Sequence, residues 1–315
     1  MDPLQFVAGT RLMIVAGKGG VGKTTVAATV ARLAADLGRH PLLVEVEGKG
    51  GLARLFGSEP LGYEPRPLAD GIDGRLITPD RALVEWMHDR GLRRLADRLV
   101  KTGALDVIAT AAPGIRDILV LGKVKALVNE AAHDLIILDT PASGHAITFL
   151  QSARGLRDAV SMGAINQQAR DVIALLADPA LCQVVLVTVP ETTPVNELVE
   201  TAYAMEDRVG VALGPVVVNR MLSGLATGLA GADATALTAR TRPMPTLDER
   251  TRLQAALHYR LERETSQADE CARLAAALPL AQVALPALPA QALDADDIAT
   301  LATALAAGLR EMAEP

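Results

Sequence analysis

A glycine-rich segment near the start of the chain carries residue types and a spacing that suit phosphate binding. Residues 17–25 read GKGGVGKTT and satisfy the pattern GxxxxGK[ST]. Glycines let successive backbone N–H groups point at phosphate oxygens, and a following helix adds the positive end of its dipole. Lys23 is expected to reach the β- and γ-phosphates of ATP, and the Thr24 hydroxyl to bind Mg²⁺. The predicted cofactor-binding residues of this loop are Gly19, Gly20, Val21, Gly22, Lys23, Thr24 and Thr25.

Three further residues have the chemistry to complete a hydrolytic site around this loop. Lys18 follows the first glycine, where its charge could stabilise a transferring phosphoryl group, although a solvated loop lysine is the alternative. Asp139 ends the apolar run LIILD and could hold a water on Mg²⁺, or serve only as a helix cap. Period-2 alternation puts Glu45 and Glu47 on one side of a strand. Glu47 is preferred as the residue that orients or deprotonates the attacking water, unless both acids simply face solvent.

The elements that must position these residues alternate short apolar runs with segments of helical periodicity. The loop follows an apolar run at 11–16 and precedes apolar positions at helical spacing in 22–37, with Gly38 as a stop. Further strands are predicted at 41–46, 135–139, 184–189, 215–219 and 280–285. This order predicts a doubly wound α/β fold with a mostly parallel sheet and helices on both faces.

Two stretches depart from this alternation because they show helical pattern throughout. Residues 80–130 and 150–180 are predicted to form a small helical subdomain within a single P-loop domain that spans 1–315. In the first stretch an arginine-rich face lies opposite leucine and methionine positions, which could pack against the sheet or line a groove. The arginines are Arg90, Arg93, Arg94 and Arg98, and such a run is usually a solvated face. Residues 222–246, rich in Gly, Ala and Thr, are predicted to form a mobile loop.

Composition and charge exclude several classes of protein. The chain has 315 residues, 50% of them hydrophobic, and a net charge of −6, which argues against a general affinity for nucleic acid. Its cysteines, Cys182 and Cys271, lie far apart, so neither a disulfide framework nor a CxxC zinc site is expected, and a reducing compartment is favoured. The start lacks a signal-peptide pattern, and no run of 18 apolar residues occurs. A cytoplasmic protein with no integral membrane segment is expected.

The lysine at position 18 makes the loop resemble the deviant Walker A motif of the MinD, ParA, ArsA and nitrogenase iron-protein group. In that group this lysine reaches across a dimer interface to the partner's phosphates, in the role of an arginine finger. The resemblance implies that Lys18 is catalytic and that the chain works with a second ATPase subunit.

Five segments, in order along the chain, are similar to the ArsA and guided-entry (GET) branch of that group. They are AAPGIRDILVLGKV (111–124), DTPASGHAITFLQ (139–151), VTVPETTPVNELVE (187–200), VVVNRM (216–221) and ALPALPAQALD (284–294). Members drive arsenite pumps or carry tail-anchored membrane proteins, which implies ATP, Mg²⁺ and a hydrophobic protein client. The resemblance also implies that Asn219 hydrogen-bonds adenine, that Pro286 belongs to the adenine loop, and that His145 couples phosphate state to the helices. On the residues alone, Asn219 could simply end a strand in a turn, and His145 could be a packing residue.

Three departures from the branch's pattern limit what the resemblance implies. Residues 47–50 read EGKG where switch I of the branch reads DPAH, so the longer Glu47 side chain would shift the water, and hydrolysis could be slow or depend on a partner. The bridging CxxC of the eukaryotic targeting ATPases is absent, which excludes a zinc-clamped homodimer. Cys182 and Cys271 alone cannot form a three-thiolate metalloid site. The sequence EVEGKGGLARLFG (45–57) resembles the shorter partner of paired bacterial anion-transporting ATPases, which are thought to form heterodimers.

Together these observations predict a dimeric Mg-ATP-binding ATPase, homo- or heteromeric, that couples hydrolysis to conformational change and carries a hydrophobic client. The alternative is a regulatory or scaffold subunit that binds nucleotide and hardly hydrolyses it. An arsenite-pump subunit and a ParA-like DNA-positioning ATPase are weaker alternatives.

Overall fold

The computed structural model describes residues 1–46, 48, 50–102, 114–140, 143–222, 224, 238 and 244–312, with the backbone alone for 143–145. Eight strands form one sheet in the order β3-β4-β2-β5-β1-β6-β7-β8. In chain order they are β1 Leu12–Gly17, β2 Pro41–Val46, β3 Arg66–Ala69, β4 Ile72–Ile77, β5 Leu135–Asp139, β6 Cys182–Thr188, β7 Ala212–Met221 and β8 Gln282–Pro286.

Strand β1 lies inside the sheet, where the strand order changes direction. It pairs in parallel with β5 on one side and with β6 on the other, so that Val15 lies beside Asp139 and Val185. The chain passes from β1 to β2 beyond β5, and it later returns to β6 on the opposite side of β1. In such sheets ligands bind outside the carboxyl ends of the strands at this switch point. The glycine-rich loop follows β1 at that point.

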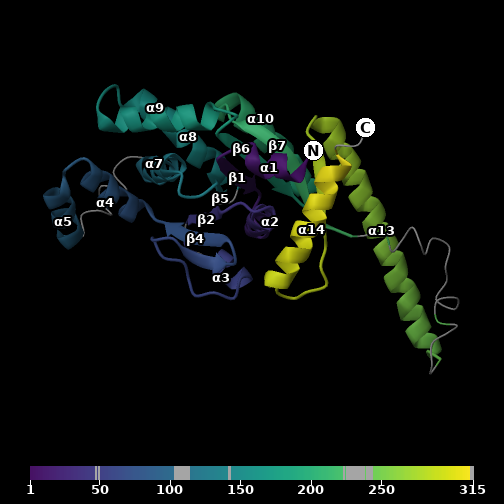
Figure 1. Cartoon of the computed structure of the whole chain (residues 1–315). Coiled ribbons are helices and arrows are strands. Elements are labelled where there is room, and N and C mark those ends of the chain that lie inside the picture. The colour runs from purple at the N-terminus through teal and green to yellow at the C-terminus, as the bar shows by residue number, and fades with distance from the viewer. Residues whose placement is uncertain are drawn as a thin grey trace.

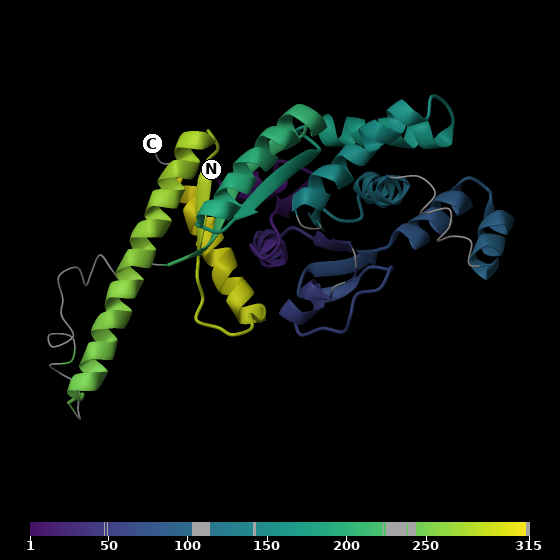
Figure 2. The same ribbon diagram turned by 180° about the vertical axis from the view of Figure 1, so that it is seen from behind.

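Helices cover both faces of the sheet (Figures 1 and 2). One face carries α1 Pro3–Ala8, α2 Lys23–Asp36, α3 Gly51–Leu55 and α14 Ala295–Glu311. The other carries α4 Pro79–Asp89, α7 Ile115–Glu130, α8 Ser143–Ala159, α9 Ala164–Ala177, α10 Thr192–Ala204 and α13 Leu247–Ala277, with α5 Arg93–Thr102 packed on α4. Alternate residues of β1 divide between the two cores, since Leu12 and Ile14 belong to one and Met13 and Val15 to the other. The predicted α/β fold class is confirmed.

Two groups of helices extend past the sheet at opposite ends of the molecule (Figure 1). α4 and α5 stand at one end, and α13, a helix of 31 residues, projects from the other. The described parts of 80–130 and 150–180 are largely helical, as expected, but their status as a separate subdomain stays a prediction. Most of the 222–246 segment lies outside the described residues.

The structure differs from the sequence-based expectation at one edge of the sheet. β3 and β4 form an antiparallel hairpin that the periodicity did not predict, since β3 has only four residues and includes Pro67. The two residues between the strands are Asp70 and Gly71, and Gly71 has a φ of 72°. An Asp-Gly pair between short apolar segments is a strong hairpin signal, so this turn was the available clue. The remaining predicted strands match observed ones, with ends displaced by up to three residues.

Across the described parts of the chain, no helix combines the length and the apolar character that crossing a bilayer requires.

Candidate nucleotide-binding site

The glycine-rich loop joins the end of β1 to the start of α2 and passes close to two neighbouring strands. A Cβ atom on Gly17 would lie 2.3 Å from the carbonyl oxygen of Val187 on β6. A Cβ atom on Gly22 would lie 2.3 Å from Nδ2 of Asn219 on β7, and Gly22 has a φ of 96°. These two positions therefore require glycine because the backbone approaches its neighbours closely. α2 begins at Lys23, so its amino end points at the loop.

A hydroxyl and a carboxylate meet beside the loop. Thr24 Oγ1 on α2 donates a hydrogen bond to Asp139 Oδ2, the last residue of β5, at 2.7 Å. The next residue, Thr140, fixes this strand end because its Oγ1 donates to the carbonyl oxygen of Val15 at 2.8 Å. Asp139 is 8% exposed, so it is a buried acid next to the phosphate loop. Hydroxyl and carboxylate oxygens are the donors that Mg²⁺ takes in phosphate sites.

A second acid lies in register with Asp139 on the neighbouring strand. Glu45 of β2 pairs with Asp139 across the parallel ladder, and its side chain is buried. Its Oε1 accepts a hydrogen bond from the backbone N–H of Gly50 at 2.7 Å. Glu45 therefore holds the start of the segment that leads into α3. Glu47, which was preferred as the catalytic acid, lies outside the described residues, as does the side chain of His145.

The two lysines of the loop have different partners within the chain. Lys23 Nζ donates to the backbone carbonyl of Lys18 at 3.1 Å. Lys18 Nζ forms an ion pair with Oε1 of Glu197 on α10 at 2.5 Å, and both side chains are about a third exposed, at 34% and 38%. Glu197 was not singled out in the sequence, although it lies in the segment 187–200. The two partners are 179 positions apart in the sequence, so no local pattern could have predicted their contact.

A cavity of about 270 Å³ lies beside Thr25, between the ends of β7 and β8. Asn219 and Pro286, both predicted as adenine-binding residues, line this cavity together with Leu288 and Gln291. The Asn219 side chain donates to the carbonyl of Val21 at 2.9 Å and accepts from the N–H of Arg220 at 2.9 Å. A side-chain amide has two N–H groups and two oxygen lone pairs, so these bonds use half of its capacity. The structure thus brings Thr25, Asn219 and Pro286 to one hollow.

The fold and the loop together define the class. A GxxxxGK[ST] loop at the switch point of a parallel α/β sheet, with a strand-end aspartate on its threonine, is the architecture of a P-loop nucleotide-binding protein.

Comparison with known proteins narrows this class to a family. The profile of the anion-transporting ATPase (ArsA) family matches residues 10–163, which include the loop and Asp139. ATPase BagA of Mycobacterium tuberculosis is 34% identical over 228 residues, which cover 68% of this chain and 66% of BagA. A protein of Halobacterium salinarum whose name describes an arsenical pump-driving ATPase is 29% identical over 240 residues, covering 70% of this chain and 37% of its own length. ATPase get3 of Neurospora crassa is 32% identical over 155 residues, covering 48% of this chain and 45% of get3.

The chain belongs to the ArsA/GET-type family, and this family and the named relatives are ATPases. Both predictions are confirmed. The matched region spans 66% of BagA and less of the other two relatives. The substrates of those whole proteins therefore cannot be assigned to this chain by similarity alone.

Proposed function

We propose that this protein binds Mg-ATP at residues 17–25 and hydrolyses it to ADP and phosphate as a dimer. The cycle of binding and hydrolysis changes its affinity for a hydrophobic client. The observation that carries the proposal is the meeting of Thr24 and Asp139 at 2.7 Å beside the glycine loop. Two oxygen donors from different elements converge there, next to the Lys23-containing loop that suits a triphosphate.

The roles of the loop residues follow from their positions. Backbone N–H groups of 19–25 would surround the phosphates, and Lys23 would leave the Lys18 carbonyl, 3.1 Å away, to reach the β- and γ-phosphates. Thr24 would bind Mg²⁺ directly and Asp139 through a water, so their mutual hydrogen bond would be replaced when the ion binds. When bound, Mg²⁺ would neutralise the charge on the β- and γ-phosphate oxygens.

Two acids are candidates for positioning the attacking water. Glu47 keeps the role proposed from its place after β2. Glu45 would act as a positioning residue because it holds the N–H of Gly50 at the far end of the same short segment. A change at the γ-phosphate would then be passed to α3 through this segment.

The adenine would occupy the cavity of about 270 Å³ that Asn219 and Pro286 line. This volume is close to the lower end of the range for ligand sites, which is about 300 Å³. Thr25 lies between the cavity and the phosphate loop, so one nucleotide could span both parts. The unused N–H and lone pair of the Asn219 amide suit the donor and acceptor edge of a base.

A second subunit would complete the site. In this chain Lys18 reaches Glu197, and in the dimer it would reach the nucleotide of the facing subunit, adding positive charge in the transition state. We take the partner to be a second copy of this chain, and a different two-lysine ATPase chain is the alternative. Release of Lys18 from Glu197 would link dimer closure to α10.

Nucleotide binding and turnover of single variants test the site. Lys23→Ala and Thr24→Ala should abolish Mg-ATP turnover and weaken ATP binding, whereas Lys101→Ala, on the exposed face of α5, should match wild type. Fluorescent ATP titration separates binding from the phosphate-release rate. Retention of wild-type turnover in Lys23→Ala would reject the proposed site. Brisk wild-type turnover would also reject the scaffold alternative.

A hydrophobic client is favoured by an apolar hollow in the helical region. A cavity of about 280 Å³ lies between α4, α5, α7 and α9. Its lining includes Leu83, Met87, Leu92, Leu95, Leu99 and Ile118. Leu83 and Met87 belong to the buried core, but Leu92 and Leu95 are 43% and 48% exposed. Part of the leucine face is therefore core and part is accessible, which is the arrangement of a groove for an apolar helix.

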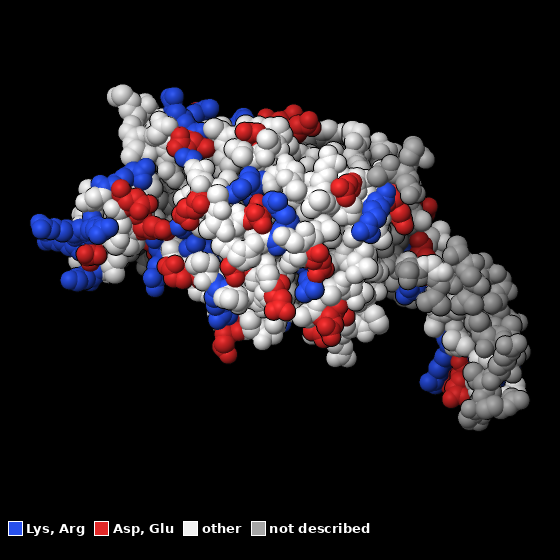
Figure 3. Space-filling model, in the orientation of Figure 1, with Lys and Arg blue, Asp and Glu red and all other residues white. Residues whose placement is uncertain are grey.

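The charge of the side chains around this groove restricts which hydrophobic client would fit. Lys and Arg side chains gather over α5 at the left end of the molecule (Figure 3), where Arg93, Arg94, Arg98 and Lys101 are exposed. An apolar helix flanked by acidic residues would fit this surface better than one flanked by basic residues. The rest of this face carries acidic and basic side chains mixed together (Figure 3), and a DNA-positioning role has no further support there.

A defined peptide tests the groove. A fluorescent apolar helical peptide should bind the ATP-bound protein, and Leu95→Asp should weaken binding on the order of tenfold, since it puts a charge into an apolar hollow. Leu253→Asp is the matched control, because Leu253 is 38% exposed on the projecting helix α13. Equal peptide affinity for wild type and Leu95→Asp would rule out this groove while leaving the ATP site intact.

A further inference from the structure

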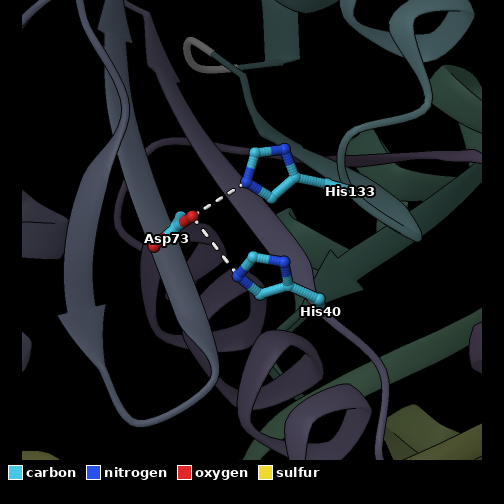
Figure 4. Close-up of side chains that lie close together, drawn as sticks. All are labelled: His40, Asp73 and His133. Carbon is cyan, nitrogen blue, oxygen red and sulfur yellow. Dashed lines mark hydrogen bonds and ion pairs between the residues drawn. The ribbon is translucent and has the colours of Figure 1, made fainter.

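Two histidines and an aspartate meet beside the sheet (Figure 4). His40 immediately precedes β2, His133 comes two residues before β5, and Asp73 is the second residue of β4. All three lie at the amino ends of their strands. His40 and Glu45 are five residues apart along β2, which corresponds to about 17 Å at 3.3 Å per residue. The cluster is therefore separate from the phosphate loop.

Both imidazole rings turn the same nitrogen toward one carboxylate oxygen. Nε2 of His133 lies 2.9 Å from Asp73 Oδ2, and Nε2 of His40 lies 3.3 Å from the same atom. The two rings have centroids 4.7 Å apart and are tilted by 36°. One possible donor atom from each residue lies within 4.8 Å of the other two. Three metal-ligating groups thus face a single point.

These spacings are close to those of a tetrahedral metal site. Zn²⁺ binds imidazole nitrogen at about 2.0–2.1 Å and carboxylate oxygen at about 2.0–2.2 Å, so neighbouring ligand atoms lie about 3.4 Å apart. The His40–Asp73 distance of 3.3 Å already matches, and the His133–Asp73 distance of 2.9 Å needs only a small opening. The three donor atoms lie within 4.8 Å of one another, so a bound ion would draw them closer through rotation of the carboxylate and of the half-exposed His40 ring.

The backbone that carries the three side chains is held in place. The His40 N–H donates to Asp134 Oδ2 at 2.8 Å, and the Asp134 N–H donates to the His40 carbonyl at 3.0 Å. Arg11 donates to the carbonyl of His133 at 3.3 Å. Asp73 pairs with Leu42 in the β2–β4 ladder. The donor positions are thus fixed before any ligand binds, which lowers the entropic cost of binding.

We infer that His40, Asp73 and His133 form a binding site for a divalent first-row transition-metal ion of the Zn²⁺ type. Two imidazoles and one carboxylate are a donor set that Zn²⁺ and its neighbours prefer over Mg²⁺ and Ca²⁺. The His133 and Asp73 side chains are 10% and 22% exposed, whereas His40 is 49% exposed, so solvent reaches the cluster from the His40 side. A water or an outside ligand would fill the fourth position there.

The same contacts also describe a simpler arrangement, in which both histidines donate hydrogen bonds to Asp73 without any metal. The two arrangements differ in a testable way. A glutamine at position 40 or 133 can still donate a hydrogen bond to Asp73 but lacks the imidazole nitrogen that a metal requires. A bound ion would join the amino ends of β2, β4 and β5, whereas the hydrogen bonds alone would not respond to added metal.

Zn²⁺ titration of the full chain tests the inference. Calorimetry without nucleotide, in excess Mg²⁺ to occupy oxygen-donor sites, should show one Zn²⁺ per wild-type chain. His133→Gln and His40→Gln should each weaken Zn²⁺ binding by at least about tenfold. His258→Gln is the control, because the His258 side chain is 69% exposed on α13, where it pairs with Glu262. Interference by thiols is limited, because burial raises the pKa of both Cys182 and Cys271 and keeps them protonated.

A second measurement uses the wild-type chain alone, so it does not depend on the variants folding. Zn²⁺ should protect His40 and His133 from acylation by diethylpyrocarbonate, measured by peptide mass spectrometry, and should leave His258 reactive. Absence of Zn²⁺ binding to the wild-type chain, wild-type affinity in both glutamine variants, or equal acylation of His40 with and without Zn²⁺ would each overturn the inference.

Discussion

At the scale of single residues, the ion pair between Lys18 and Glu197 must break before Lys18 can reach the nucleotide of a facing subunit. The two side chains meet at 2.5 Å and are 34% and 38% exposed. Exposed pairs of this kind contribute about 0–1 kcal/mol, so Glu197 can hold Lys18 without preventing its transfer to a facing nucleotide. The pair therefore acts as a weak internal competitor of the proposed dimer contact.

Removing this competitor should favour the closed dimer. Glu197→Gln is expected to raise ATP turnover at low protein concentration by up to about fivefold, the factor that corresponds to roughly 1 kcal/mol. The measurement is turnover per chain against protein concentration. Glu200→Gln makes the same charge change on the exposed side of α10 and should behave as wild type. A loss of turnover in Glu197→Gln would show instead that Glu197 supports the chemistry.

At the scale of elements, an ion-pair network holds α4 against α7. Glu85 of α4 accepts hydrogen bonds from Lys123 Nζ at 2.7 Å and from the Tyr63 hydroxyl at 2.5 Å. Burial alone would raise the pKa of Glu85, but the hydrogen bonds from Lys123 and Tyr63 outweigh it and leave the pKa below its ordinary value. Lys123 is 9% exposed, so the loss of Glu85 would leave its buried ammonium with the longer contact to Glu130 at 3.7 Å.

The lowered pKa gives this contact a definite pH dependence. A carboxyl group whose pKa is lowered by folding stabilises the folded state above its unfolded pKa, and this stabilisation is lost as pH falls through the folded pKa. Glu85→Gln should lower the free energy of unfolding by about 0.5–1 kcal/mol at neutral pH, because solvent partly screens the 36% exposed Glu85 side chain. The difference should shrink in acid below that pKa. Urea unfolding at both pH values measures it, with exposed Glu59→Gln as control. A difference that stays constant with pH would contradict the assignment.

Prediction from sequence succeeded where the signal is local along the chain. The loop 17–25, the strand that ends in Asp139 and the stop at Gly38 depend on neighbouring residues, and the structure has each of them. The hairpin β3–β4 was missed because its strands are short and include Pro67, so periodicity was weak. Its only strong signal was the pair Asp70-Gly71.

Contacts between distant segments could not be predicted in the same way. Lys18 meets Glu197 across 179 positions, and His133 meets Asp73 across 60. These pairs exist only because the strand order β4-β2-β5-β1-β6 places their elements together, and that order is not encoded in any short pattern. The proposed adenine site was predictable in part, because Asn219 and Pro286 matched a family pattern. The cavity that these residues share with Thr25 could be seen only in the fold, and its binding of adenine stays a prediction.

At the scale of the whole molecule, the proposed nucleotide site and the apolar groove lie in different parts of one fold. The phosphate loop follows β1 inside the sheet, while the groove lies among α4, α5, α7 and α9 at one end (Figure 1). α7 and α8 pack together, and α8 begins four residues after Asp139. A shift at the carboxyl end of β5 would therefore reach the groove through α8 and α7.

In the proposed dimer, Lys18 of one subunit acts on the nucleotide of the facing subunit. Mixing two inactive variants tests it most directly: Lys18→Ala keeps the loop that binds ATP, and Lys23→Ala keeps Lys18 but binds ATP poorly. In a mixed dimer the intact Lys18 of one chain faces the ATP of the other. Each variant alone should lack turnover, and the mixture should regain a substantial part of the wild-type rate. A mixture no more active than the sum of its parts, or full turnover by Lys18→Ala alone, would contradict this role of Lys18.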